Sequence, residues 1–230
     1  MVCDSLLYHP TLLKLIKFID STPKREKSFR LVAYLSRFLS YYLARQGFLS
    51  ETVQIFKTLK AQITLTRKGM RFLKPLNHLE TALKAYDNKL TDSVLKITTI
   101  IRNLGYAAYL SVDLVVWFKL LGVLDHKKAP NAALWALRFW LVGLVAGLVN
   151  DLRVWQINST KLKTVGADEK TDIKEIEKKL FGAKRKLVWD ALDTFICLNS
   201  LNYLHFTEGD VGLAGVITSV MGLKDLWAAT

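Results

Sequence analysis

Apolar residues recur along this chain every three or four positions, in runs that are separated by proline, glycine or polar residues. Residues three and four apart lie on one side of an α-helix, whereas strands alternate with a period of two. Long alternation of that kind is absent from the sequence. We therefore expect an all-α protein. The predicted helices cover residues 11–20, 24–45, 52–74, 76–89, 91–124 (one long helix or two short ones), 131–156 and 211–228, and a charged stretch at 167–186 leads into a further helix at 187–206.

The four prolines support these boundaries. Pro10, Pro23, Pro75 and Pro130 each stand where a helical pattern begins or ends. Proline has no backbone N–H, so it is tolerated in the first turn of a helix and breaks a helix elsewhere.

The best candidate for a membrane span is the stretch 131–149, in which Arg138 is the one charged residue. Its length approaches the roughly 20 residues that a span needs. Gly143 and Gly147 have the GxxxG spacing of closely packed membrane helices, although a buried helix of a soluble protein has the same pattern.

Two other apolar stretches are weaker candidates. Residues 104–124 contain Asp113 and Lys119, which are costly at the middle of a bilayer. Residues 211–223 are uncharged but short, and they could form a shallow hairpin with 195–206. We expect one to three hydrophobic helices in the C-terminal half of the chain.

The segment 56–74 predicts a cationic amphipathic helix. At 100° per residue its basic side chains fall within one sector of about 120°; they are Lys57, Lys60, Arg67, Lys68, Arg71 and Lys74. The rest of the circumference is mainly apolar and includes Leu59, Ile63, Leu65, Met70, Phe72 and Leu73. Gly69 lies within the apolar part and weakens the helix by roughly 1 kcal/mol.

Two interpretations of this helix are open. It can lie in the headgroup plane of an anionic phospholipid membrane, with its apolar side among the acyl chains. Alternatively, the apolar side packs on the rest of the protein and the basic side is simply solvated. No acidic residue occurs between Thr52 and Leu79. Solvated helix faces usually interleave both signs of charge, so we favour the membrane.

Composition agrees with a membrane-associated protein. The 230 residues are 51% hydrophobic and yet carry a net charge of +13. Most of that charge lies in the first hundred residues, with 17 basic against 7 acidic. We predict a basic amphipathic membrane-binding region (1–100), hydrophobic anchoring helices (101–156), a charged linker or helix (157–186) and a C-terminal helical hairpin (187–230).

Enzyme and metal-site patterns are lacking. Cys3 and Cys197 are far apart, which excludes a disulfide framework and fits a reducing compartment. None of the four histidines stands at ligand spacing, and no P-loop, GxSxG or HExxH motif occurs. Asp190 and Asp193 could be an acid/base pair, but a polar stripe that meets basic partners is the simpler interpretation. We expect no catalytic residues, cofactor, metal or nucleic-acid partner.

Several segments resemble the peroxisomal membrane protein 11 (peroxin-11) family, fungal type. They are residues 1–10 (MVCDSLLYHP), 25–27 (REK), 74–79 (KPLNHL), 86–90 (YDNKL), 190–195 (DALDTF), 212–215 (GLAG) and 222–227 (GLKDLW). The resemblance covers essentially the whole chain in order and is least familiar at 154–186.

This resemblance implies a peroxisomal membrane protein that elongates and tubulates the organelle before fission. It further implies a homo-oligomer and assistance to a dynamin-related fission GTPase and its membrane adaptor. The family's membrane-inserting helix corresponds to the segment 56–74. A channel for small metabolites, lined by polar residues such as Asp113, Lys119 or Arg138, is the second hypothesis, and a soluble helical adaptor is the third.

Overall fold

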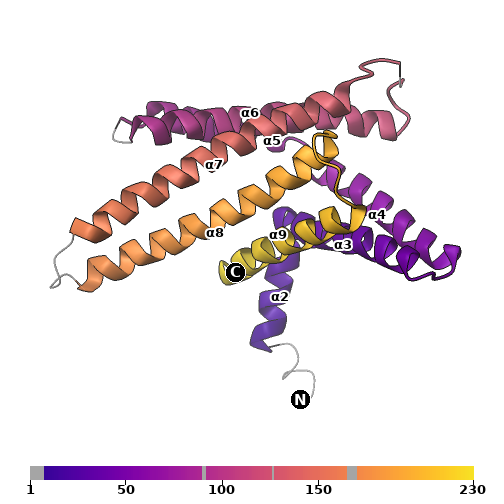
Figure 1. Ribbon diagram of the computed structural model, residues 1–230, viewed down its shortest axis with the longest axis horizontal. Coiled ribbons are helices and arrows are strands. Elements are labelled where there is room, and N and C mark those ends of the chain that lie inside the picture. Colours follow the sequence, from indigo (N-terminus) through magenta and orange to yellow (C-terminus); the bar gives the residue numbers. More distant parts are fainter. Residues whose placement is uncertain (1–7, 90–91, 126, 165–169) are drawn as a thin grey trace. The chain divides into compact units, whose positions relative to one another are not determined.

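A computed structural model describes residues 8–89, 92–125, 127–164 and 170–230 of the chain (Figure 1). These ranges fold into helices without a strand, so the all-α prediction is confirmed. The helices are α2 (Pro10–Asp20), α3 (Thr22–Arg45), α4 (Ser50–Met70), α5 (Lys74–Asp87), α6 (Ser93–Leu120), α7 (Ala132–Thr164), α8 (Lys170–Ser200) and α9 (Glu208–Ala228). Cys3 and residues 165–169 of the predicted charged segment lie outside the described ranges.

Local sequence accounts for several helix starts. Proline occupies the first turn of α2, α3 and α5. The Asp92 carboxylate accepts hydrogen bonds from the backbone N–H groups of Val94 and Leu95 and so caps α6. At α9, Thr207 and Asp210 exchange hydrogen bonds in a capping box. Such caps satisfy N–H groups that have no partner inside the helix.

The predicted helix at 52–74 is too long at its C-terminal end. α4 ends at Met70, a turn follows, and Lys74 begins α5. Leu73 has a left-handed backbone conformation with φ of 60°. A continuous helix would bring the Pro75 ring against the Arg71 carbonyl four residues earlier, where no N–H is available to bond it. Four of the predicted cations therefore lie within α4, whereas Arg71 is its C-cap residue and Lys74 begins α5.

The chain divides into two compact units. Unit 1 consists of residues 1–72 and 205–230, and unit 2 of residues 73–204. The predicted boundaries at 100, 156 and 186 each fall inside a helix, namely α6, α7 and α8. The two parts of the predicted C-terminal hairpin, α8 and α9, belong to different units. The functions assigned to the four predicted segments stay predictions.

In unit 1, α3 packs against α4 and against α9, and α2 adds a smaller contact with α3 (Figure 1). The packing of α9 is unusually close. A Cβ atom added to Gly212 would lie 2.7 Å from the backbone nitrogen of Phe38. Gly209 and Gly215 meet the rings of Tyr41 and Tyr34 in the same way. Glycines at a spacing of three thus form a groove in α9 that receives the aromatic side chains of α3.

In unit 2, each helix packs on the next along the chain: α5 on α6, α6 on α7 and α7 on α8. The core contains Leu144, Cys197 and Leu201, which are buried and surrounded by Tyr106, Leu137, Trp140 and Leu141. α6 and α7 cross at two glycines, because a Cβ on Gly105 would lie 2.8 Å from the backbone nitrogen of Gly143.

Candidate membrane-binding surface

The predicted cationic helix, α4, is docked on the rest of unit 1 through a mixed stripe of apolar and basic side chains. Val53 is buried, and Lys60 and Arg67 lie on the same side of the helix, at spacings of seven residues. The docked side therefore cuts across the predicted division into a basic and an apolar face. Ile63 and Met70 also lie on this side and are half-buried.

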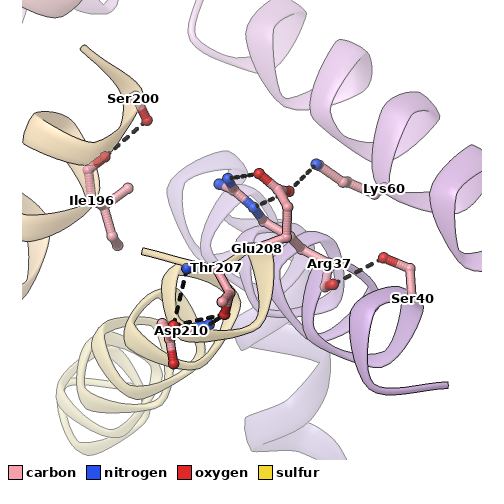
Figure 2. A network of polar contacts seen from close by, with 8 residues as sticks. All are labelled: Arg37, Ser40, Lys60, Ile196, Ser200, Thr207, Glu208 and Asp210. Atoms are coloured by element: carbon pink, nitrogen blue, oxygen red, sulfur yellow. Dashed lines mark hydrogen bonds and ion pairs between the residues drawn. The ribbon is translucent and has the colours of Figure 1, made fainter. Parts of the chain in front are cut away.

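Two carboxylates engage the docked cations. Arg67 forms an ion pair of 2.8 Å with Glu26 of α3, and both side chains are largely buried. Lys60 lies 3.1 Å from Glu208, the first residue of α9. Figure 2 shows that Glu208 also receives both hydrogen bonds of the Arg37 guanidinium, at 2.7 and 2.6 Å. Glu208 thus connects α9 with α3 and α4.

The remaining predicted cations have different surroundings. Lys57 is exposed on α4, whereas Lys68 is half-buried. Arg71 is the C-cap residue of α4, and its backbone N–H donates to the Lys68 carbonyl. Lys74 is half-buried at the start of α5 in unit 2. The structure therefore does not gather all six side chains on one face.

The side of α4 that faces away from the docked stripe is partly apolar. Ile55 is 63% exposed and Leu59 is 39% exposed, one helical turn apart. Leu65 is half-buried, while Phe72 and Leu73 are exposed in the turn that follows α4. Ile55 and Leu59 also line an open groove of about 990 Å³, together with Lys57 and with Phe48 in the loop between α3 and α4. This outward surface combines apolar side chains with a cation.

Gly143 and Gly147 both lie at helix contacts inside unit 2. Gly143 faces the Tyr106 ring and the Arg102 carbonyl of α6. At Gly147 an added Cβ would meet the Asp190 carboxylate at 2.5 Å and the Arg102 guanidinium at 2.6 Å. The two glycines therefore make room for α6 and for an ion pair between α6 and α8.

That ion pair belongs to a buried polar cluster that sequence spacing did not indicate. Arg102 and Asp190 are 2.7 Å apart, and Lys186 lies 3.1 Å from Asp151. Burial raises the pKa of Asp190 to about 6; Arg102 opposes this shift, and the Asp151 carboxylate adds to it. Asp193 accepts a hydrogen bond from the Trp189 indole. Asp190 thus pairs with a basic side chain, whereas Asp193 accepts a hydrogen bond from an indole.

Of the residues suggested for a metabolite channel, Asp113 and Lys119 lie on α6 and Arg138 lies on α7. Asp113 is buried on α6. The Lys119 amine donates to the Ala129 carbonyl, and the Arg138 guanidinium lies 4.9 Å from the centre of the Trp135 ring.

Among the described helices, α7 and α9 are long and apolar enough to cross a membrane by length and composition. About a third of the most apolar window of α7 is buried, whereas a core helix of a soluble protein would be mostly covered. Its exposed residues include Val142, Val145 and Val149, which form a stripe at helical spacing. Trp135 and Trp155 are also exposed. They stand about 30 Å apart along the helix axis, close to the thickness of a hydrocarbon core.

The described helices, with two that are long and apolar enough to cross a membrane and a basic segment at 57–74, are typical of an all-α membrane-associated protein. The family model of peroxisomal biogenesis factor 11 (PEX11) matches residues 12–227. The chain is 42% identical to peroxisomal membrane protein PMP27 of Saccharomyces cerevisiae, with all of both chains covered. It is 39% identical to peroxisomal membrane protein PMP30A of Candida boidinii, over 100% of this chain and 99% of that protein. No solved structure matches.

The chain belongs to the PEX11 family. It is a peroxisomal membrane protein that takes part in peroxisome biogenesis and proliferation. Its relatives are named as membrane proteins and biogenesis factors and not as enzymes. A more distant relative, peroxisomal biogenesis factor 11 of Schizosaccharomyces pombe, is 25% identical over 95% of this chain.

Proposed function

We propose that this protein elongates the peroxisomal membrane before fission by inserting α4 into the anionic leaflet that it faces. The observation that carries the proposal is an acid-free segment between Thr52 and Leu79, which holds six cations and leaves Ile55 and Leu59 exposed. An apolar helix wedged among headgroups expands one leaflet relative to the other. Positive curvature of the membrane follows.

Insertion of the whole apolar face requires α4 to leave α3, because Ile63 and Met70 lie on the docked side. Release separates the buried pair of Arg67 with Glu26. Because both charges then regain water or lipid phosphate, the cost stays below the roughly 3–5 kcal/mol that loss of one partner alone brings. The more exposed pair of Lys60 with Glu208 adds about 0.2–1 kcal/mol. Lipid phosphates replace these carboxylates, and each cation near an anionic surface contributes about 1 kcal/mol.

Apolar insertion decides the balance in favour of the membrane. Each Leu, Ile or Phe side chain that becomes well buried among acyl chains contributes about 1.5–3 kcal/mol. Even half of that value for Leu59, Leu65 and Phe72, added to phosphate contacts of the four cations within α4, exceeds the loss of the two ion pairs. On a neutral membrane the phosphate contribution is much smaller, so α4 stays docked there.

The test compares peroxisome shape in cells that lack the endogenous protein. We expect the full chain to produce elongated peroxisomes and the double variant Leu59→Glu plus Ile63→Glu to leave them round. Leu83→Glu is the matched control, since Leu83 is 65% exposed on α5 and lies outside the segment. Elongation by the double variant at normal protein levels would show that α4 is not the working element.

A second variant tests release itself. Glu208→Gln removes the charge that holds Lys60 and Arg37, so α4 should leave α3 more easily and peroxisomes should become longer. Vesicle tubulation by the purified protein should also need less anionic lipid. Equal lipid dependence for the variant and the unsubstituted chain would argue against a release step.

Self-association and assistance to a dynamin-related GTPase and its adaptor complete this proposal. Crosslinking of two differently tagged copies on peroxisomes tests the first, and recovery of the GTPase with the tagged chain tests the second. Absence of both products in cells with elongated peroxisomes would restrict the protein to membrane bending.

A channel is the second candidate, favoured by the charges among α6, α7 and α8. Asp151 lies on the candidate span α7, and Arg102 pairs with Asp190 beside it. Ionisable groups at membrane depth often line ion or solute paths. Conductance in planar bilayers that Asp151→Asn changes and the α4 double variant does not would support a channel. Conductance that neither variant changes would argue against this path.

A further inference from the structure

The first described helix of unit 1, α2, has an apolar face that nothing in the described part of the chain covers. α2 has 11 residues, and Phe18 is the one large apolar side chain of the helix that is buried. The Phe18 ring packs on Trp227 of α9, with ring centres 5.5 Å apart. The other large apolar residues are 37–49% exposed; they are Leu12, Leu13, Leu15, Ile16 and Ile19.

The exposed residues form one continuous face. With Leu12 at 0° and 100° per residue, the five side chains span a sector of about 160°, from Leu15 through Ile16 to Leu13. Lys14, Lys17 and Phe18 occupy the opposite part of the circumference. The Lys14 amine lies 4.9 Å from the centre of the Trp227 ring, on the docked side. Asp20, the one acidic residue of the helix, falls at about 80°, within the apolar sector. It is the last residue of α2 and so lies beyond the five apolar side chains along the helix axis.

We infer that α2 is a second membrane-binding element, which lies in the headgroup plane with this face among the acyl chains. An 11-residue helix is about 16 Å long, too short to cross a bilayer. A helix with a wide apolar face bordered by lysines is suited to the surface of an anionic membrane. The protein resides in the peroxisomal membrane, so such a surface is always near.

The chemistry of the face favours lipid over a second copy of the chain. Protein interfaces are rich in Tyr, Trp and Arg at their centres. The exposed face of α2 contains leucine and isoleucine, and its aromatic residue, Phe18, is used inside unit 1. Acyl chains require no shape complementarity from such a face, and the exposed Lys17 can meet a phosphate at its border.

α2 differs from α4 in needing no rearrangement. The exposed face of α2 is open while Phe18 holds the helix on α9, whereas the apolar face of α4 is partly covered by docking. α2 therefore binds the membrane in the folded state and brings unit 1 to the surface on which α4 is released. This inference rests on the membrane location of the family and does not require the proposed action of α4.

Spin labels on the full chain test the inference. In a Cys3→Ser background, Ile16→Cys and, separately, Lys17→Cys carry a nitroxide, and the labelled chain is reconstituted into vesicles of phosphatidylcholine with phosphatidylserine. The Cys3→Ser chain without a new cysteine is treated with the same label as a control. Its signal reports any reaction at Cys197, which is buried. Collisions with oxygen should dominate over a water-soluble nickel complex at position 16 and not at position 17.

Two results would contradict insertion of the apolar face of α2 into the membrane. Equal access of the nickel complex to positions 16 and 17 would place the helix in water. Protection of position 16 from both reagents, with spin–spin broadening between labels, would assign the face to a second copy.

A substitution on the same face provides a further check. Leu12→Glu in the chain labelled at position 16 should abolish the lipid signal, because it places a charge among the acyl chains beside the label. Thermal unfolding should be unchanged, because Leu12 is exposed. A lipid signal that survives Leu12→Glu would contradict insertion of this face.

The two membrane elements are separable in this assay. The α4 variant Leu59→Glu plus Ile63→Glu should keep the lipid signal at position 16 even if it no longer elongates peroxisomes. Loss of the signal in that variant would mean that α2 has no membrane contact of its own. Omission of phosphatidylserine should reduce the signal, and Lys17→Gln should reduce it in the mixed vesicles.

Discussion

At the scale of single residues, glycines decide how closely the helices approach. Gly182 of α8 has nothing within 4 Å of the position of an added Cβ, whereas Gly212 of α9 faces the backbone of α3. The same residue type therefore has opposite effects at the two positions. In α8 glycine merely weakens the helix, but in α9 it permits the contact that joins the C-terminal helix to α3.

This contrast gives a matched pair of variants. Gly212→Ala forces the α3 backbone to move and should destabilise unit 1 by about 1–3 kcal/mol. Gly182→Ala removes only the flexibility of glycine and should stabilise α8 by up to about 1 kcal/mol. Thermal unfolding followed by circular dichroism in detergent measures both. Equal midpoints for the two variants would contradict the close packing of α9 on α3.

A second residue, His78, makes the stability of unit 2 depend on pH. Burial lowers the pKa of His78 below its ordinary value. The nearby cations Lys74 and Arg102 lower the pKa further, and a hydrogen bond with Asn103 opposes the shift. The folded state thus holds the neutral ring. Its stabilising contribution is present above about pH 6.5 and is lost as the pH falls toward the lowered pKa. His78→Gln should flatten this dependence, and the exposed His205→Gln should not. Unfolding midpoints between pH 5 and 8 test this.

At the scale of elements, α4 is held by charges that the membrane can replace. A helix docked only by apolar side chains would gain little from exchanging protein for lipid. The buried pair of Arg67 with Glu26 makes docking sensitive to anionic lipid, since phosphate competes for the guanidinium. α2 has no comparable ion pair to the rest of unit 1 among the described side chains.

Removal of the buried carboxylate should therefore have a large effect. Glu26→Gln leaves the Arg67 cation buried without its charged partner and should destabilise the docked state by about 3–5 kcal/mol. Glu208→Gln acts on a half-exposed pair and should cost less than about 1 kcal/mol. Protease cleavage within α4 in the absence of lipid measures the population of released helix. Similar cleavage rates for the two variants would contradict this ranking.

At the scale of the whole molecule, the chain forms two units whose residues are interleaved in sequence. Unit 1 begins with the N-terminal helices and is completed by α9, while unit 2 lies between them along the chain. Elements that pack together open together, so hydrogen exchange should follow the units and not the order of the sequence.

Hydrogen exchange on the full chain in detergent tests this division. Gly212→Ala should speed exchange in α3 and α9 while leaving α6 and α7 as in the unsubstituted chain. Faster exchange throughout the chain would show that the units unfold as one. The matching variant in unit 2 is Gly143→Ala, where the added Cβ meets the Arg102 carbonyl at 3.2 Å. Gly143→Ala should speed hydrogen exchange in α6 and α7 and leave exchange in α3 and α9 unchanged.

The sequence alone determined the helical class, because that depends on the local spacing of apolar residues. It determined most of the helix positions, because caps and prolines mark them. It indicated the family, because characteristic segments follow one another in order. It also located the acid-free cationic segment, since charge is a property of the residues themselves. The end of α4 at Met70 was missed, although Pro75 offered a local signal.

The tertiary structure decided which faces are available. Arg67 and Glu26 are 41 residues apart, and Arg102 and Asp190 are 88 apart, so no local pattern could pair them. The return of α9 to α3 is likewise a long-range contact. The helix wheel of residues 56–74 predicts an amphipathic α4, but packing covers part of its apolar face and leaves that of α2 open. Burial depends on neighbours that are distant in sequence, and only the folded chain brings them together.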